Sequence, residues 1–213
     1  MNTLFLLILF GVSFLLVGLT IRIAPQFGLL DIPNARSSHT HHCTRGGGIV
    51  FVIIWCLSSS VLATPSFIPA WPFILLGALL TAAVGFWDDL RGIKPSVRII
   101  FHLLAAIVGT VPLLSMTELS MGLTSLHVGG ALWLFFILAV VWSINLFNFM
   151  DGTDGLAALE AILIFSVGGL MFSLQTVNGS GANAAVNVEL SMLCGLLVAS
   201  VTGFFLWNFP RAK

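Results

Sequence analysis

Seven apolar runs, each about long enough to cross a lipid bilayer, constrain this chain more than any other feature of its sequence. Short segments rich in Pro, Gly, Ser and Asn, which are typical of turns, separate the runs. Only 8% of the residues are charged, against about 25% in ordinary soluble domains. The pattern predicts an all-α, polytopic membrane helical bundle in a single domain over residues 1–213. The expected spans are Leu4–Ala24, Gly47–Leu62, Trp71–Trp87, Val97–Leu114, Ala131–Phe149, Leu156–Leu174 and Val188–Trp207.

The basic residues predict how the bundle is oriented. All eight fall on one side if the N-terminus lies outside, because the second, fourth and sixth loops contain none. Cytoplasmic loops carry an excess of Lys and Arg, so the odd-numbered loops are expected to be cytoplasmic. The N-terminal run has no basic residues ahead of it, which favours a retained first helix over a signal peptide. Most acidic residues fall on the same side, so any ionic chemistry is expected to face the cytoplasm.

Composition narrows the function classes further. The net charge is zero, which gives no indication of nucleic-acid binding. The three cysteines are odd in number and widely spaced, so a disulfide framework is not expected. The fourth loop, Met116–Gly130, is short and apolar with paired glycines, and we expect a small hairpin there.

The first candidate motif runs from Asp31 to Gly48 in the first cytoplasmic loop. Arg36 and Arg45 are fixed cations suited to phosphate, and the Gly46–Gly48 triplet precedes an expected helix whose N-terminal amides could bind an anion. Two other interpretations remain open. The arginines could only set the topology, or the residues His41–Cys43 could bind zinc, although adjacent residues rarely converge on one ion.

The second candidate motif is Asp88-Asp89, followed by the cations Lys94 and Arg98. The aspartates end an expected helix at the partially negative pole of its dipole, where adjacent carboxylates repel the dipole and each other. A divalent cation would remove that penalty, and Mg²⁺ commonly binds one or two carboxylates together with substrate phosphates. The alternative is a solvated helix end with lysine and arginine as counter-ions.

The third candidate motif repeats polar residues every three positions, at Asn145, Asn148, Asp151 and Asp154. A straight helix would point the first and last of these in opposite directions, but glycines at 152 and 155 permit a broken turn. The aspartates could hold a metal, orient a nucleophile or accept a proton, and the asparagines could bind a base or a sugar. A polar helix cap is the alternative. The histidines at 102 and 127 lie outside the motifs and are interpreted as ordinary helix or loop residues.

Taken together, the three motifs resemble the polyprenyl-phosphate N-acetylhexosamine-1-phosphate transferases (glycosyltransferase family 4). The resemblance rests on Asp31-x-Pro-Asn-x-Arg36-Ser-Ser-His39 with Arg45-Gly-Gly-Gly48, on Gly85-x-x-Asp88-Asp89, and on Asn145-x-x-Asn148-x-x-Asp151-Gly-x-Asp154-Gly155. Their order and spacing follow the family. The Arg-Ser-Ser-His version is most similar to the bacterial branch that loads an aminosugar phosphate onto undecaprenyl phosphate for O-antigen or exopolysaccharide.

The resemblance implies a reaction. Undecaprenyl phosphate would attack a UDP-N-acetylaminosugar in the bacterial inner membrane, giving a lipid-diphosphate-sugar and UMP with Mg²⁺ as cofactor, as a first step of O-antigen or cell-wall polysaccharide synthesis. By the same resemblance Asp88, Asp89, Asp151 and Asp154 would be catalytic. Asp88 and Asp89 would hold Mg²⁺ or engage the lipid phosphate, and Asp151 and Asp154 would take catalytic or nucleotide-positioning roles. The substrate-binding residues would be Arg36, His39, Arg45, Lys94, Arg98, Asn145 and Asn148.

Two departures from the family accompany the resemblance. Residues 42–44 read His-Cys-Thr where the family usually has Pro-Thr-Pro. Residues 208–213 also end where the family continues into a Gly-Asp-x-Gly-Ser motif, further spans and a histidine-containing loop, so we expect the family's C-terminal third to be missing. A non-catalytic membrane module for binding or assembly is therefore the alternative function, ahead of a transporter. The sequence does not give an oligomeric state, and a homodimer is one possible assembly.

Overall fold

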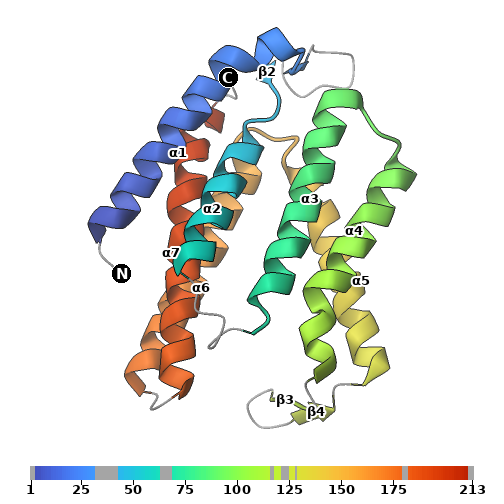
Figure 1. The fold of residues 1–213 in the computed structure, drawn as a ribbon, viewed down its shortest axis with the longest axis vertical. Coiled ribbons are helices and arrows are strands. Elements are labelled where there is room, and N and C mark those ends of the chain that lie inside the picture. Colours follow the sequence, from blue (N-terminus) through green and yellow to red (C-terminus); the bar gives the residue numbers. More distant parts are fainter. Residues whose placement is uncertain are drawn as a thin grey trace. The chain divides into compact units, whose positions relative to one another are not determined.

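The computed structural model is almost entirely helical, and it describes residues 3–31, 43–62, 69–115, 118–120, 125–127, 129–178 and 182–210 (Figure 1). Each of the seven predicted apolar runs corresponds to one helix, so the all-α prediction is confirmed. Two 3₁₀ turns, η1 (Ala24–Phe27) and η2 (Val111–Ser115), extend α1 and α4. The helices are α1 (Thr3–Ile23), α2 (Gly48–Leu62), α3 (Trp71–Arg91), α4 (Pro95–Thr110), α5 (Gly130–Met150), α6 (Leu156–Asn178) and α7 (Ala182–Asn208).

Two short antiparallel strand pairs lie in the loops. β1 (Leu30–Asp31) pairs with β2 (Cys43–Thr44), so the first loop begins and ends side by side. β3 (Glu118–Ser120) pairs with β4 (Ser125–His127), with Leu119 opposite Leu126. The second pair confirms the predicted hairpin.

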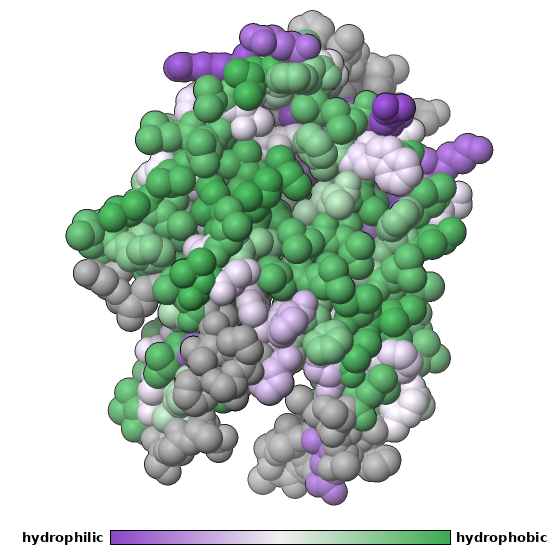
Figure 2. Space-filling model, in the orientation of Figure 1, coloured by the Kyte–Doolittle hydropathy of each residue, from purple (hydrophilic) through white to green (hydrophobic). Residues whose placement is uncertain are grey.

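The helices have the length and surface of membrane spans. Within the described residues, six are long and apolar enough to cross a membrane, whereas α2 has 15 residues and is shorter. At 1.5 Å per residue α2 is about 22 Å long, less than the roughly 30 Å hydrocarbon core. Apolar residues cover the middle of the helices on the face shown in Figure 2, and hydrophilic residues lie mostly toward their ends. The chain is therefore a multi-pass membrane protein.

The chain divides into two compact units: unit 1 (Met1–Phe67 with Asn148–Lys213) and unit 2 (Ile68–Phe147). In unit 1, α7 packs against α1, α2 and α6. Two hydrogen bonds join α1 to α7: Ser13 Oγ donates to the Ser200 carbonyl at 2.6 Å, and Trp207 Nε1 donates to the Phe14 carbonyl at 2.9 Å. Because hydrocarbon offers these polar groups no partner, satisfying them across a helix pair stabilises the pair.

A glycine lets α1 and α7 approach closely, and its replacement is the first testable prediction. A Cβ at Gly203 would lie 2.6 Å from Ser13 Cβ and 2.7 Å from the Phe14 backbone nitrogen. We expect Gly203→Ala to destabilise unit 1 by about 1–3 kcal/mol, because the two helices must move apart. The measurement is thermal unfolding in detergent. Gly11→Ala is the matched control, since a Cβ there meets nothing within 4 Å. An equal unfolding temperature for both variants would contradict the prediction.

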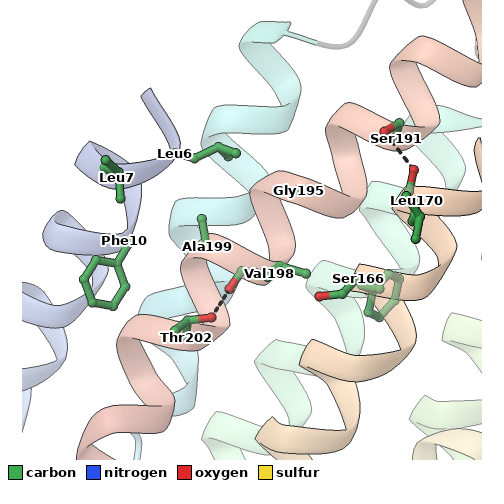
Figure 3. Close-up of a pocket in the computed structure, with 12 residues that line it drawn as sticks. Leu6, Leu7, Phe10, Ser166, Leu170, Ser191, Gly195, Val198, Ala199 and Thr202 are labelled. Carbon is green, nitrogen blue, oxygen red and sulfur yellow. Dashed lines mark hydrogen bonds between the residues drawn. The ribbon is translucent and has the colours of Figure 1, made fainter. Parts of the chain in front are cut away.

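Unit 1 also contains a groove of about 590 Å³ between α1, α6 and α7 (Figure 3). Two hydroxyl groups that line the groove donate hydrogen bonds to backbone carbonyls. Ser191 Oγ donates to the Gly169 carbonyl at 2.9 Å, and Thr202 Oγ1 donates to the Val198 carbonyl at 2.6 Å. The remaining lining is mostly apolar, and no predicted site residue is part of it. The groove therefore lies apart from the candidate motifs.

Unit 2 contains α3, α4, the β3–β4 hairpin and most of α5. α3 packs closely on α4, where a Cβ at Gly77 would lie 3.0 Å from the Ala105 carbonyl oxygen. Trp133 Nε1, at the start of α5, donates to the Thr110 carbonyl, at the end of α4, at 3.2 Å. The end of α4 thus meets the beginning of α5.

Candidate functional site

The Arg45 loop, residues 45–48, leads from β2 into α2 in unit 1. The Arg45 amide donates to the Leu29 carbonyl at 3.1 Å, and the residue itself is exposed. Gly46 has φ +83°, a conformation that favours glycine, and α2 begins at Gly48. The structure confirms that the glycine triplet leads into a helix N-terminus. Arg36 and His39, the other predicted binding residues of this motif, lie outside the described residues, as do His41 and His42 of the zinc alternative.

The acidic turn, residues 151–155, joins α5 to α6. α5 ends at Met150, and the Thr153 amide donates to its carbonyl at 3.0 Å, so the helix breaks where the glycines predicted it. Gly155 has φ +74°, and α6 begins at the next residue. Asn148 and Asp151 are exposed, and Asp154 is half-buried. The two carboxylates therefore lie in a defined turn outside the spans.

The C-terminal end of α7 supports both of these segments. A Cβ at Gly47 would lie 3.4 Å from the Phe204 ring, and Phe51 of α2 packs on the same ring with centroids 5.4 Å apart. A Cβ at Gly155 would lie 2.9 Å from Phe209 Cβ. Because Phe204 of α7 contacts the Gly47 position and Phe209 just beyond α7 contacts the Gly155 position, unit 1 places the Arg45 loop and the acidic turn at the same end of one helix.

Crowding affects the acidity of one carboxylate in the turn. Part of the Asp151 side chain reaches the surface, yet neighbouring protein atoms desolvate its carboxyl group and raise its pKa above the ordinary value. A raised pKa means that Asp151 takes up a proton at a higher pH than a free aspartate does. This is the behaviour expected of a carboxylate that could accept a proton in a reaction.

Asp88, in unit 2, is held by partners on both of its carboxylate oxygens. Oδ1 accepts from the Ile93 amide at 2.9 Å, and Oδ2 accepts from Arg98 Nη1 at 2.8 Å. Gly92, with φ +62°, ends α3 by donating its amide to the Asp88 carbonyl at 2.8 Å. Asp88 therefore joins the end of α3 to the beginning of α4. The predicted phosphate-binding cation Arg98 is paired with it, whereas Lys94 precedes α4 and is exposed.

The metal prediction for the Asp88-Asp89 pair is not tested by these contacts. Asp89 is half-buried beside Asp88 in the last turn of α3. Within the described residues, three or more His, Cys, Asp or Glu side chains do not gather into a metal-ligand group. A metal bound by the pair would therefore take its other ligands from water or substrate, which is how Mg²⁺ is often held.

Asn145 interacts with a residue that sequence reasoning interpreted as ordinary. Its Nδ2 donates to the Val141 carbonyl at 2.8 Å, and its side chain lies beside His102 of α4. The His102 side chain also lies in the electrostatic field of Arg98 and Asp88, and the residue is 3% exposed. The sequence could have indicated His102. It lies four residues after Arg98, on the same face of the expected helix, and ionisable residues are rare in membrane spans.

The structure thus assembles the predicted residues in two groups, one in each unit. Unit 2 brings together Asp88, Arg98 and Asn145, with His102 as the addition. Unit 1 brings the Arg45 loop and the acidic turn to one end of α7. Both groups combine fixed cations with carboxylates at the ends of apolar helices. Such sets can bind phosphate groups and accept protons.

Comparison with known proteins agrees with these features. The pattern that defines glycosyl transferase family 4 matches residues 71–213, which contain the second and third motifs. The phospho-N-acetylmuramoyl-pentapeptide-transferase of Limosilactobacillus reuteri (strain DSM 20016) is 29% identical over 183 residues, covering 78% of this chain and 53% of its own. The probable undecaprenyl-phosphate N-acetylglucosaminyl 1-phosphate transferase of Bacillus subtilis (strain 168) is 29% identical over 198 residues, covering 90% of this chain and 51% of its own.

The chain spans about half the length of these curated relatives. The family match covers more than half of the chain itself, and it includes every predicted site residue beyond the first loop. The chain belongs to glycosyl transferase family 4.

Proposed function

We propose that this protein transfers an N-acetylaminosugar-1-phosphate from a UDP-sugar to undecaprenyl phosphate, releasing UMP. The product is a lipid-diphosphate-sugar, made in the bacterial inner membrane with the site facing the cytoplasm, as a starting unit for O-antigen or cell-wall polysaccharide. The named relatives support a phospho-sugar transfer, since one is a phospho-N-acetylmuramoyl-pentapeptide-transferase and another a probable N-acetylglucosaminyl 1-phosphate transferase.

One observation carries the proposal: the motif carboxylates lie at the ends of membrane-length helices with cations close by. Asp88 ends α3 and pairs with Arg98, and the acidic turn shares its end of α7 with the Arg45 loop. A lipid phosphate reaches a protein at the membrane surface, so helix ends are where it can meet a water-soluble UDP-sugar. Cations would hold the phosphates there, and carboxylates would bind a metal or take a proton.

The proposed reaction needs positioning more than covalent help. An oxygen of the lipid phosphate attacks the β-phosphorus of the UDP-sugar, the bond from that phosphorus to the bridging oxygen breaks, and UMP leaves. The carboxylates of Asp88 and Asp89 fit Mg²⁺, which would neutralise phosphate charge when bound. In unit 1, Arg45 and the N-terminus of α2 would bind phosphate, and in unit 2 Lys94 would do so. Asp151 or Asp154 would take up a proton or orient the attacking phosphate, with Asn145 and Asn148 hydrogen-bonding the nucleotide or sugar.

A second candidate function is a binding module without catalysis. The observation in its favour is that the Asp88 carboxylate already accepts hydrogen bonds from the Ile93 amide and from Arg98, which a bound metal would have to displace or share. Such a protein would still bind the UDP-sugar or the lipid phosphate through the same charged groups.

One assay separates the two functions. The purified 213-residue protein is incubated in detergent with undecaprenyl phosphate, Mg²⁺ and UDP-N-acetylglucosamine, and UMP is measured. UMP release that needs both substrates supports the transferase. Saturable binding of the UDP-sugar without UMP, for this donor and for other UDP-N-acetylaminosugars, would instead identify a binding module.

The raised pKa of Asp151 predicts a pH dependence. If ionised Asp151 is the proton acceptor, kcat/KM should fall on the acid side at a pH above the ordinary aspartate range, because crowding favours its protonated form. Asp151→Asn should remove this acid limb along with most activity. The substitution should not lower the unfolding temperature at neutral pH. At that pH the ionised Asp151 carboxylate disfavours folding, because its pKa is higher in the folded protein than in the unfolded chain. An unchanged acid limb in Asp151→Asn would contradict the assignment.

A further inference from the structure

We propose that the apolar groove of unit 1 binds one acyl chain of a membrane phospholipid. The groove lies between α1, α6 and α7, and neither the three motifs nor the family match assigns it a ligand (Figure 3). The proposal is independent of the transferase reaction, because none of the described site residues lines the groove. The bound lipid would complete the packing of the three helices.

The groove lies at the depth of the hydrocarbon core. On α7 its lining runs from Ser191 to Thr202, within a helix that is long and apolar enough to cross a membrane. That stretch is about 17 Å long at 1.5 Å per residue, and one leaflet of a hydrocarbon core of roughly 30 Å is about 15 Å deep. On α1 the lining starts at Leu6, close to where the helix begins. The groove therefore has the length of one acyl chain that enters from the side of the α1 N-terminus.

Small residues of α7 give the groove its depth. Gly195 and Ala199 lie four residues apart on one face of α7 and line the groove, and Figure 3 shows α1 and α6 on either side of that helix. Larger apolar side chains line it from α1 and α6, and two of them, Leu7 and Leu170, are each 60% exposed. An acyl chain that lies along α7 would contact both of these side chains and cover them.

The size and chemistry of the groove favour a hydrocarbon chain over a helix or water. Spread over its length, 590 Å³ corresponds to a mean cross-section of about 35 Å², less than half that of a helix about 10 Å across, so a further helix would not fit. Water would find few partners, because the lining is mostly apolar and the hydroxyls of Ser191 and Thr202 already donate to backbone carbonyls. A hydrocarbon chain needs no polar partner, and it supplies the dispersion contacts that an empty groove would lack.

The charges around the groove indicate the class of lipid. All twelve lining residues are uncharged. The sequence has no Lys or Arg in residues 1–21 or 99–210, which include every lining residue of the three helices. Arg22 lies in the last turn of α1, about 18 Å along the helix beyond Phe10. An anionic headgroup at the opposite end of α1 would therefore meet no basic side chain from these stretches. A zwitterionic headgroup, as in phosphatidylethanolamine, needs none.

Native mass spectrometry tests the site directly. The full chain is reconstituted with phosphatidylethanolamine, phosphatidylglycerol and undecaprenyl phosphate, extracted in mild detergent, and the lipids that stay bound are counted and identified. We expect one phosphatidylethanolamine per chain. Ser166→Phe fills the groove from an exposed position on α6 and should lose the bound phospholipid. Val167→Phe is the matched control, because Val167 is 56% exposed and outside the lining, and this variant should keep the lipid.

A second pair of variants changes the α1 side of the groove. Leu7→Ser shortens a lining side chain that is 60% exposed, and Ile8→Ser changes its neighbour, which is 54% exposed and outside the lining. Leu7→Ser should retain less phospholipid than Ile8→Ser. Added phosphatidylethanolamine should also raise the unfolding temperature of the unchanged protein more than that of Ser166→Phe, because a ligand that binds the folded state stabilises it.

Three results would overturn the proposal. They are a phospholipid retained equally by Ser166→Phe and Val167→Phe, a phosphatidylglycerol or undecaprenyl phosphate bound in place of phosphatidylethanolamine, and an unchanged protein that retains no lipid. None of these measurements involves UMP release, so the lipid site and the proposed function can fail separately.

Discussion

Asp89→Asn is expected to lower the rate of UMP release by about 100-fold or more. Removing one preorganised electrostatic partner of a reacting phosphoryl group commonly costs about that factor. Asn keeps the shape of Asp and removes its charge, so the loss would come from the missing negative charge. The Mg²⁺ concentration for half-maximal rate should also rise, because the proposed metal would lose one of its two anionic ligands.

The neighbouring variant Asp88→Asn should affect both activity and stability. The Asp88 carboxylate bonds both the Ile93 amide and Arg98, so its loss frees a cation and loosens the α3–α4 connection. We expect lower activity together with a lower unfolding temperature. Arg91→Gln, an exposed charge change in the same last turn of α3, serves as the control and should retain activity. Full turnover in Asp89→Asn at any Mg²⁺ concentration would remove its metal role.

Hydropathy predicted the helices well because a membrane leaves a chain few choices. Backbone groups in hydrocarbon must bond within their own segment, so an apolar run of sufficient length becomes a helix. One helix, α2, is shorter than the others. It begins at Gly48, directly after Gly46 and Gly47, and Gly46 has a positive φ. The division into two units was not predicted, because it depends on which helices pack together. In unit 1, for example, α1 packs on α7, from opposite ends of the sequence.

The candidate site was predictable where its residues are close in sequence. The break after Met150 followed from the glycines in the acidic turn, and a carboxylate beside basic residues at the end of α3 indicated an ionic contact. The proximity of His102 to Asn145 was missed because the two residues lie on different helices. A single histidine in an apolar run resembles any buried core residue. The support of Gly155 by Phe209 was missed for the same reason, since they lie in different elements.

Gly155→Ala is expected to reduce turnover by about 100-fold and to lower the unfolding temperature. An ordinary residue at φ +74° costs about 1–2 kcal/mol, and the added Cβ would lie 2.9 Å from Phe209 Cβ and 3.2 Å from the Phe205 ring. The turn must therefore move away from the end of α7, and it carries both catalytic candidates. A displacement of about 1 Å in a positioned group can cost a factor of about 100 in rate.

Two matched variants separate the backbone strain of a positive φ from the steric clash between an added Cβ and Phe209. Gly28 has φ +77° and open space where a Cβ would lie, so Gly28→Ala carries the backbone strain alone and should lower stability without a comparable loss of turnover. Gly155→Asn tolerates a positive φ better but keeps the colliding Cβ. We expect Gly155→Asn to lose nearly as much activity as Gly155→Ala, because the aromatic residues at the end of α7 hold the turn in place. Normal turnover in Gly155→Asn would show that the contact with Phe209 does not position Asp151 and Asp154.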